Sequence, residues 1–275
     1  AHILGKGPEL PNEISDIEIP SPNGPISARV YRPSQEELLP ALVFYHGGGF
    51  VIGDLETHDK ECRLLCANAG CIVIAVDYRL APESPFPAAV EDAWAALEWV
   101  AGEGEQLGVD TARLAVGGDS AGGNLAAVIA LMARDASIDL KLQMLVYPAT
   151  DASKHHDSFT ENVDGPLLTV EVIEWFWSHY LGSASDSEVR NDWRFSPARA
   201  DDHSGLAPAY IATCSADPLR DEGNAYAVQL SGAGVPVQHS LFEGQPHTLF
   251  QMFNVSEGAK DLIGECAMAL KTALG

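Results

Sequence analysis

Two hydrophobic patterns follow each other along the chain. Residues 14–19 and 26–31 alternate polar and β-branched apolar positions, and Ser-Pro-Asn-Gly-Pro separates them. Alternation on both sides of turn-forming residues predicts an antiparallel hairpin. The later apolar runs are short and continuous, as expected for strands buried on both faces. They cover residues 41–45, 71–76, 113–116, 142–147, 210–214 and 235–241.

Segments of helical length lie between most of these runs. They cover residues 57–68, 87–101, 120–134, 221–233 and 256–274. Strands that alternate with helices form right-handed crossovers, which give parallel strands with helices on both faces. We therefore predict an α/β fold with a mostly parallel eight-stranded sheet and an N-terminal antiparallel hairpin.

Residues 151–207 break this rhythm because they contain no clean apolar strand. Their main feature is an aromatic helical stretch at residues 170–181, which contains Trp175, Phe176, Trp177 and Tyr180. We interpret 151–207 as a small helical cap insertion, with 1–150 and 208–275 as the two parts of the core. Ordinary helix packing is the alternative for each aromatic residue, and a pocket cover requires the insertion to lie at the carboxyl ends of the strands.

Charge and cysteine content restrict the partners. With 16 Lys and Arg against 39 Asp and Glu, the net charge is −23, which excludes nucleic-acid binding and repels anionic membranes. The five cysteines have unrelated spacings, so we expect neither a disulfide framework nor a zinc site. No apolar run reaches the roughly 18 residues that a membrane-spanning helix needs, and the first 20 residues do not resemble a signal peptide. We therefore expect a cytoplasmic location, with or without residues upstream of Ala1.

A glycine-serine motif marks a candidate nucleophile. Ser120 lies in Gly-Asp-Ser-Ala-Gly, directly after a predicted strand and directly before a predicted helix. At such a junction a strained turn exposes the serine hydroxyl above the sheet. The alternative is a glycine-rich turn capped by a serine. Nucleotide-binding glycine patterns are absent from the sequence, so we expect no cofactor, and we expect no metal.

A second glycine motif ends the strand at residues 41–45. It reads His46-Gly47-Gly48-Gly49-Phe50. Three successive glycines cost backbone entropy, and they suit a place where side chains would obstruct a close approach. Main-chain amides of such a loop can face a developing oxyanion. The alternative is a flexible loop.

An acid and a base follow in the chain order that this chemistry needs. Asp217 comes first after the strand at 210–214, and His247 follows the last predicted strand. Ser, then Asp, then His is the order of a serine hydrolase built on a parallel sheet. Asp221 and Glu222 are the rival acids, but they resemble first-turn residues of the next helix.

Four motifs together resemble the hormone-sensitive-lipase-like family of α/β-hydrolase carboxylesterases. They are His46-Gly47-Gly48-Gly49-Phe50, Asp77-Tyr78-Arg79-Leu80-Ala81-Pro82-Glu83, Gly118-Asp119-Ser120-Ala121-Gly122-Gly123-Asn124-Leu125-Ala126 and Asp217-Pro218-Leu219-Arg220-Asp221-Glu222-Gly223. The resemblance implies an α/β-hydrolase fold in which Ser120 is the nucleophile, His247 the base and Asp217 the acid that orients it.

The same resemblance implies further roles. The amides of Gly48, Gly49 and Ala121 would form the oxyanion hole, and His46 would organise the loop. Asp77, Tyr78, Arg79 and Glu83 would be structural, in buried ion pairs or hydrogen bonds.

The chain departs from the family at two places. Thr248 follows His247 where the family has glycine, which predicts an altered pocket wall beside the base. Family members carry a longer N-terminal cap segment than residues 1–13, so either the cap is reduced or the sequence is truncated.

The resulting prediction is hydrolysis of short- to medium-chain carboxylic esters through an acyl-enzyme. We expect a small-molecule ester as partner, in an apolar pocket formed by Phe50, Trp175, Phe176, Trp193 and Leu249. A non-catalytic receptor on the same fold, or an amidase or lactonase with the same triad, are the alternatives. The resemblance also suggests a homodimer that pairs through the last strand.

Overall fold

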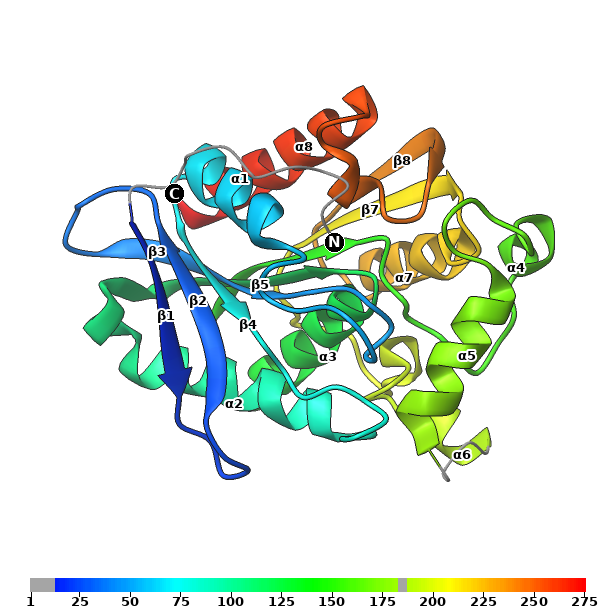
Figure 1. Ribbon diagram of the computed structural model, residues 1–275, viewed down its shortest axis with the longest axis horizontal. Helices are drawn as coiled ribbons and strands as arrows, with labels where there is room; N and C mark the ends of the chain where they lie inside the picture. Colours follow the sequence, from blue (N-terminus) through cyan, green and yellow to red (C-terminus); the bar gives the residue numbers. More distant parts are fainter. Residues whose placement is uncertain (1–12, 183–186) are drawn as a thin grey trace.

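A mixed sheet forms the centre of the molecule (Figure 1), and the computed structural model describes residues 13–182 and 187–275. Within these residues the sheet has eight strands in the order β1-β2-β4-β3-β5-β6-β7-β8. The strands are β1 (Glu13–Ile19), β2 (Ile26–Arg32), β3 (Leu39–Tyr45), β4 (Ile72–Val76), β5 (Val109–Asp119), β6 (Leu140–Val146), β7 (Ala209–Ala216) and β8 (Val237–Pro246). β2 is antiparallel to β1 and to β4, and every later pair is parallel. The predicted hairpin and parallel sheet are confirmed.

Two layers of helices cover the sheet because its inner strands are apolar on both faces. Every residue of β3 is buried, with Leu42 and Phe44 in one hydrophobic cluster and Val43 and Tyr45 in the other. The helices α1 (Asp59–Ala69) and α8 (Glu257–Leu274) cover the sheet face that carries the first cluster, at the top of Figure 1. The second cluster is closed by α2 (Ala88–Glu103), α3 (Ala121–Asp135) and α7 (Arg220–Gly232).

Some strands extend beyond their apolar runs. The pattern predicts a strand at 113–116, but β5 continues to Asp119, and Gly118 pairs with Tyr45 of β3. Glycine and aspartate do not extend an apolar run, so the hydrophobic pattern does not reveal that the strand continues through residues 117–119. β8 likewise continues to Pro246, directly before His247.

The expected helical insertion lies between β6 and β7. Its described residues form α4 (Asp157–Glu161), α5 (Val170–Leu181), α6 (Ser187–Arg190) and the short 3₁₀ helix η3 (Pro197–Arg199), with no strand among them. Figure 1 places α4, α5 and α6 together at one end of the sheet. The expected N-terminal cap remnant falls on residues 1–12, outside the described residues, and on Glu13, which begins β1.

β8 ends the sheet, and among the described strands only β7 pairs with it. Pairing of two chains through this edge stays a prediction. None of the helices in the described ranges has both the length and the apolar character needed to cross a membrane.

Candidate active site

Four segments meet at one edge of the sheet because the strands that carry them are parallel. The glycine loop follows β3, Ser120 lies between β5 and α3, Asp217 follows β7 and His247 follows β8. All four therefore lie at the carboxyl ends of strands, where open α/β sheets place their ligand sites.

A strained turn presents Ser120. Its φ of 56° and ψ of −117° lie in a region that side chains rarely adopt. The turn also brings α3 against β3. A Cβ atom would lie 1.9 Å from the Tyr45 carbonyl oxygen if Gly122 carried one, and 2.3 Å from it if Gly118 did. Only glycine fits at these two positions, so the motif spacing has a steric reason.

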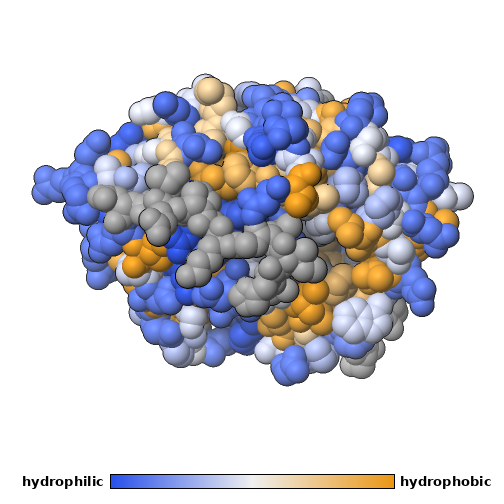
Figure 2. Space-filling view, turned by 45° about the horizontal axis from the view of Figure 1, so that its top comes forward, coloured by the Kyte–Doolittle hydropathy of each residue, from blue (hydrophilic) through white to orange (hydrophobic). Residues whose placement is uncertain are grey.

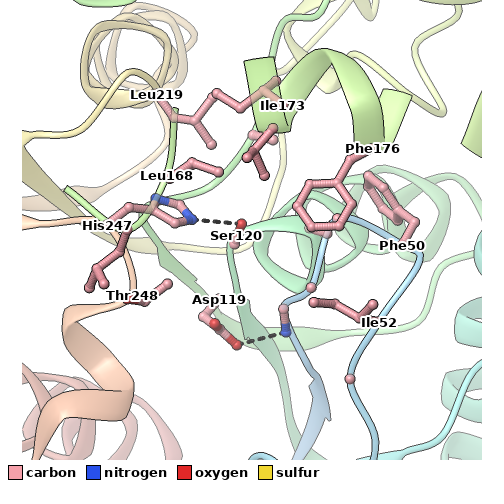
Figure 3. Close-up of a pocket in the computed structure, with 18 of the residues that line it drawn as sticks. Phe50, Ile52, Asp119, Ser120, Leu168, Ile173, Phe176, Leu219, His247 and Thr248 are labelled. Atoms are coloured by element: carbon pink, nitrogen blue, oxygen red, sulfur yellow. Dashed lines mark hydrogen bonds between the residues drawn. The ribbon is translucent and has the colours of Figure 1, made fainter. Parts of the chain in front are cut away.

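Hydrogen bonds join the three candidate triad residues, and Figure 3 shows the one between His247 and Ser120. His247 Nδ1 lies 2.7 Å from Asp217 Oδ2, and His247 Nε2 lies 2.8 Å from Ser120 Oγ. A carboxylate only accepts hydrogen bonds, so Nδ1 carries the proton and Nε2 is left to accept from the serine hydroxyl. Asp217 is fully buried, and its second oxygen accepts from the Leu219 amide at 2.9 Å. The structure thus brings together the three residues that the sequence selected.

The rival acids have other partners. Asp221 accepts from the Ser158 amide at 2.9 Å and pairs with Arg220 at 2.7 Å. Glu222 accepts from the Thr150 amide at 2.6 Å, and burial raises the pKa of its carboxyl well above the ordinary value. Neither contacts His247 through a hydrogen bond.

Three main-chain amides beside Ser120 have no partner among the described residues, two of them in the glycine loop and one at the start of α3. Gly48 has φ +124° and Gly49 has φ +62°. The amide of Gly47 donates to Asp119 Oδ1 at 2.9 Å. The amides of Gly48, Gly49 and Ala121 donate to no other residue in the described part of the chain. The amides predicted for an oxyanion hole are therefore available to a ligand.

Residues behind the loop hold its shape. The His46 ring stacks on Tyr78 at 4.3 Å between centroids, its Nδ1 lies 2.7 Å from the Gly47 carbonyl, and the Tyr78 hydroxyl donates to the His46 carbonyl. Arg79 pairs with buried Asp92 at 2.8 Å. Glu83 is exposed, so the expected burial was wrong for that residue.

A buried ion pair lies under the nucleophile turn. His58 Nε2 lies 3.1 Å from Asp119 Oδ1. Burial opposes the charged form of both groups, but their mutual attraction outweighs it, which raises the pKa of His58 and lowers the pKa of Asp119. The sequence placed His58 only at the start of a helix, and no motif indicated that it would meet Asp119.

A cavity of about 530 Å³ opens beside Ser120. Its walls differ in chemistry. The apolar wall comes from the insertion and from the loop after β7, and consists of Leu167, Leu168, Val172, Ile173, Phe176, Trp177 and Leu219. The polar wall consists of Thr57, His58, Asp119, Thr248 and Gln251. In Figure 3, Ile173, Leu168 and Leu219 lie on one side of His247 and Ser120, and Thr248 and Asp119 lie on the other.

The mouth of the cavity is partly apolar. Leu167 is 67% exposed and Ile52 is 56% exposed, although both line the cavity. Figure 2 shows hydrophobic residues gathered right of centre, with further hydrophobic groups above the centre and on the left.

The predicted pocket residues divide into two groups. Phe50 and Phe176 line the cavity, whereas Trp175, Trp193 and Leu249 do not, so the prediction was wrong for these three. Trp175 lies on the other side of α5 against the His179 ring, and Trp193 packs at the margin of a core cluster. Leu249 is fully buried between the sheet and α8.

Helical spacing could have selected the right residues of α5. Val172, Ile173, Phe176 and Trp177 stand at i, i+1, i+4 and i+5 and form one face, from which Trp175 is turned away. No comparable signal marks Thr57 or Gln251, which reach the cavity from distant segments.

No group of three or more His, Cys, Asp or Glu side chains in the described ranges could hold a metal ion. All five cysteines are buried thiols.

Comparisons with known proteins agree with this geometry. A family model described as alpha/beta hydrolase fold matches residues 42–251. The carboxylic ester hydrolase LipN of Mycobacterium tuberculosis is 45% identical over 98% of this chain and 72% of its own. Ethyl acetate hydrolase of Pseudomonas putida is 41% identical over 95% of this chain and 83% of its own. The solved esterase of Pyrobaculum calidifontis has a TM-score of 0.92 and 44% identity, and the match covers 97% of this chain and 88% of that one.

Proposed function

Because the chain belongs to the α/β-hydrolase family, in its hormone-sensitive-lipase-like group of carboxylesterases, we propose that it is a serine carboxylesterase acting on short- to medium-chain esters. The observation that carries this proposal is the hydrogen-bonded chain from Ser120 through His247 to Asp217, beside three available amides.

Acylation begins when the Ser120 oxygen attacks the acyl carbon. His247 Nε2 takes the serine proton at 2.8 Å, and Asp217 stabilises the imidazolium that results. The carbonyl electron pair moves to oxygen, which the amides of Gly48, Gly49 and Ala121 receive. Each such donor typically contributes about 3 to 4 kcal/mol to transition-state stabilisation.

Collapse of this intermediate breaks the bond to the alcohol. His247 Nε2 returns the proton to the leaving oxygen, and the acyl group stays on Ser120. Water then enters, gives its proton to Nε2 and attacks the acyl carbon, and the carboxylic acid departs as Ser120 recovers its proton. Every proton in the cycle passes through one imidazole nitrogen.

The cavity and the charge favour small neutral esters. A volume of about 530 Å³ with a long apolar wall suits a short or medium alkyl chain. The net charge of −23 repels carboxylates and anionic lipid surfaces. The relative named ethyl acetate hydrolase supports a short-chain substrate. The five thiols support a cytoplasmic location, since disulfides form in oxidising compartments.

The test compares wild type with Ser120→Ala on p-nitrophenyl butyrate. We expect turnover to fall on the order of a millionfold, as in other triad deletions. A folded variant that retains a tenth of the activity would refute the proposal. Matched ester and amide substrates separate an esterase from an amidase, and a wild-type chain without turnover on any activated ester would favour the receptor alternative.

A further inference from the structure

Thr248 has a backbone conformation that suits glycine. Its φ is +65° and its ψ is 11°, in the left-handed region, at the start of the 3₁₀ helix η4 (Leu249–Met252). For a β-branched residue this is a genuine outlier, because the branched Cβ crowds the backbone. Such outliers persist where their surroundings fix the backbone, and they concentrate at ligand sites.

The neighbours of Thr248 fix its conformation. His247 on one side is held by Asp217 and Ser120. On the other side Leu249 and Phe250 are fully buried, and the Phe250 amide donates to the Tyr147 hydroxyl at 3.2 Å. The chain must therefore turn sharply at residue 248 to place the imidazole in the site and the next two side chains in the core.

The hydroxyl of Thr248 has no hydrogen-bond partner among the residues that the structure describes. The side chain is half-buried and lines the cavity, below His247 in Figure 3 and across from Ile173 and Leu219. A glycine would satisfy the turn with less strain, and the side chain that the threonine adds lies in the lining of the cavity.

The other side chains of the polar wall already have partners. Gln251 Nε2 lies 2.8 Å from His58 Nε2, Thr57 Oγ1 lies 3.0 Å from His58 Nδ1, and His58 also meets Asp119. Thr248 thus contributes a hydroxyl without a partner and a methyl group to a wall whose other polar side chains bond to one another.

We propose that Thr248 is a specificity-determining residue that limits the length of the ester substituent bound along the polar wall and offers that substituent a hydrogen bond. The preferred occupant is a short chain that carries an ether oxygen, and methoxyacetyl and 2-methoxyethyl groups serve as its probes. The inference rests on the proposed esterase function and names a preference within it.

The test measures kcat/KM for wild type, Thr248→Gly and Thr248→Val. One set of substrates runs from p-nitrophenyl acetate to octanoate, with the methoxyacetate as an isostere of the butyrate. A second set holds the acetyl group constant and varies the alcohol, with 2-methoxyethyl against butyl acetate. The two sets identify which substituent lies on the polar wall. Ratios between variants cancel the intrinsic reactivity of each ester.

In one of the two sets, Thr248→Gly should raise kcat/KM for long relative to short substituents by about tenfold, the effect of one or two methylene groups of space. Thr248→Val should keep the wild-type length limit and lose about tenfold in preference for the methoxy isostere. Ser137→Gly is the matched control, because Ser137 also has positive φ, at 61°, but is exposed and outside the cavity. It should leave both profiles unchanged.

Length and methoxy profiles of Thr248→Gly that coincide with wild type would overturn the inference while leaving the esterase proposal intact. An equal loss on every substrate, with a lower unfolding midpoint, would make Thr248 a structural residue and also overturn it. Absence of turnover in wild type would instead overturn the proposed function, and the inference with it.

Discussion

Gly49→Ala is the sharpest perturbation of the proposed oxyanion hole. A Cβ atom at this position would lie 2.2 Å from Cγ of Phe176 and 2.5 Å from both Cδ atoms, over the ring itself. Gly49 also has φ +62°, a conformation that costs alanine about 1–2 kcal/mol. The loop, the ring or both must therefore move.

The expected loss of kcat follows from the position of the Gly49 amide, which the loop sets. If the loop moves, the Gly49 amide no longer faces the oxyanion, and the loss of one such donor lowers kcat by about 10²–10³-fold. The donor acts on charge that exists only in the transition state, so KM should change little. Phe176 belongs to the apolar wall, and Phe176→Ala alone should mainly raise KM.

Steady-state kinetics on p-nitrophenyl butyrate, together with circular dichroism, would measure both effects. The double variant Gly49→Ala/Phe176→Ala removes the ring that the new methyl group meets, and should recover about tenfold of the lost kcat, with the backbone strain of about 1–2 kcal/mol remaining. A folded Gly49→Ala variant with kcat within about threefold of wild type would show that this amide does not stabilise the oxyanion.

The remaining predictions concern the acid of the triad and a buried carboxyl group. Asp217→Asn should lower kcat by about 10⁴-fold, because an amide favours the wrong tautomer of His247. Asp221→Asn is the control and should leave kcat within about threefold of wild type, since Asp221 pairs with Arg220 and not with His247. Burial raises the pKa of Glu61 to about 7, so the folded state binds this proton more tightly than the unfolded state does. The free energy of unfolding should therefore fall as the pH rises from about 4.5 through 7, by about 3 kcal/mol in total. Urea unfolding at pH 5 and pH 8 should show most of this loss in wild type and in the surface control Glu98→Gln. A Glu61→Gln variant with the same loss would contradict the assignment.

The sheet and the triad could be predicted because their signals are local and their geometry is shared. Continuous apolar runs mark strands buried on both faces, and parallel strands bring their carboxyl ends to one edge. Once Ser120, Asp217 and His247 each follow a strand, the fold brings them together. The ends of β5 and β8 escaped prediction because glycine and polar residues continue those strands.

The pocket was less predictable because its walls are set by packing between distant segments. Aromatic content pointed to Trp175, but the helical face decides which side chains enter the cavity, and Trp175 lies outside that face. His58 stands 61 residues before Asp119, and no sequence pattern marks two buried groups of opposite charge that meet beneath a turn. Thr248 was noticed only as a departure from a motif, and its φ gives that departure a physical meaning.

The insertion does more than cover the site. The Phe176 ring of α5 fills the space that a side chain at residue 49 would occupy, so α5 packs directly on the loop that carries the oxyanion amides. The same helix supplies four residues of the apolar wall. A shift of α5 that admits a larger acyl chain would therefore also move Phe176 relative to Gly49. Substitutions that shift this helix and press Phe176 against Gly49 should couple substrate range to kcat, whereas removal of the Phe176 ring itself should act mainly on KM. Substitutions on the polar wall at Thr248 should change substrate range alone.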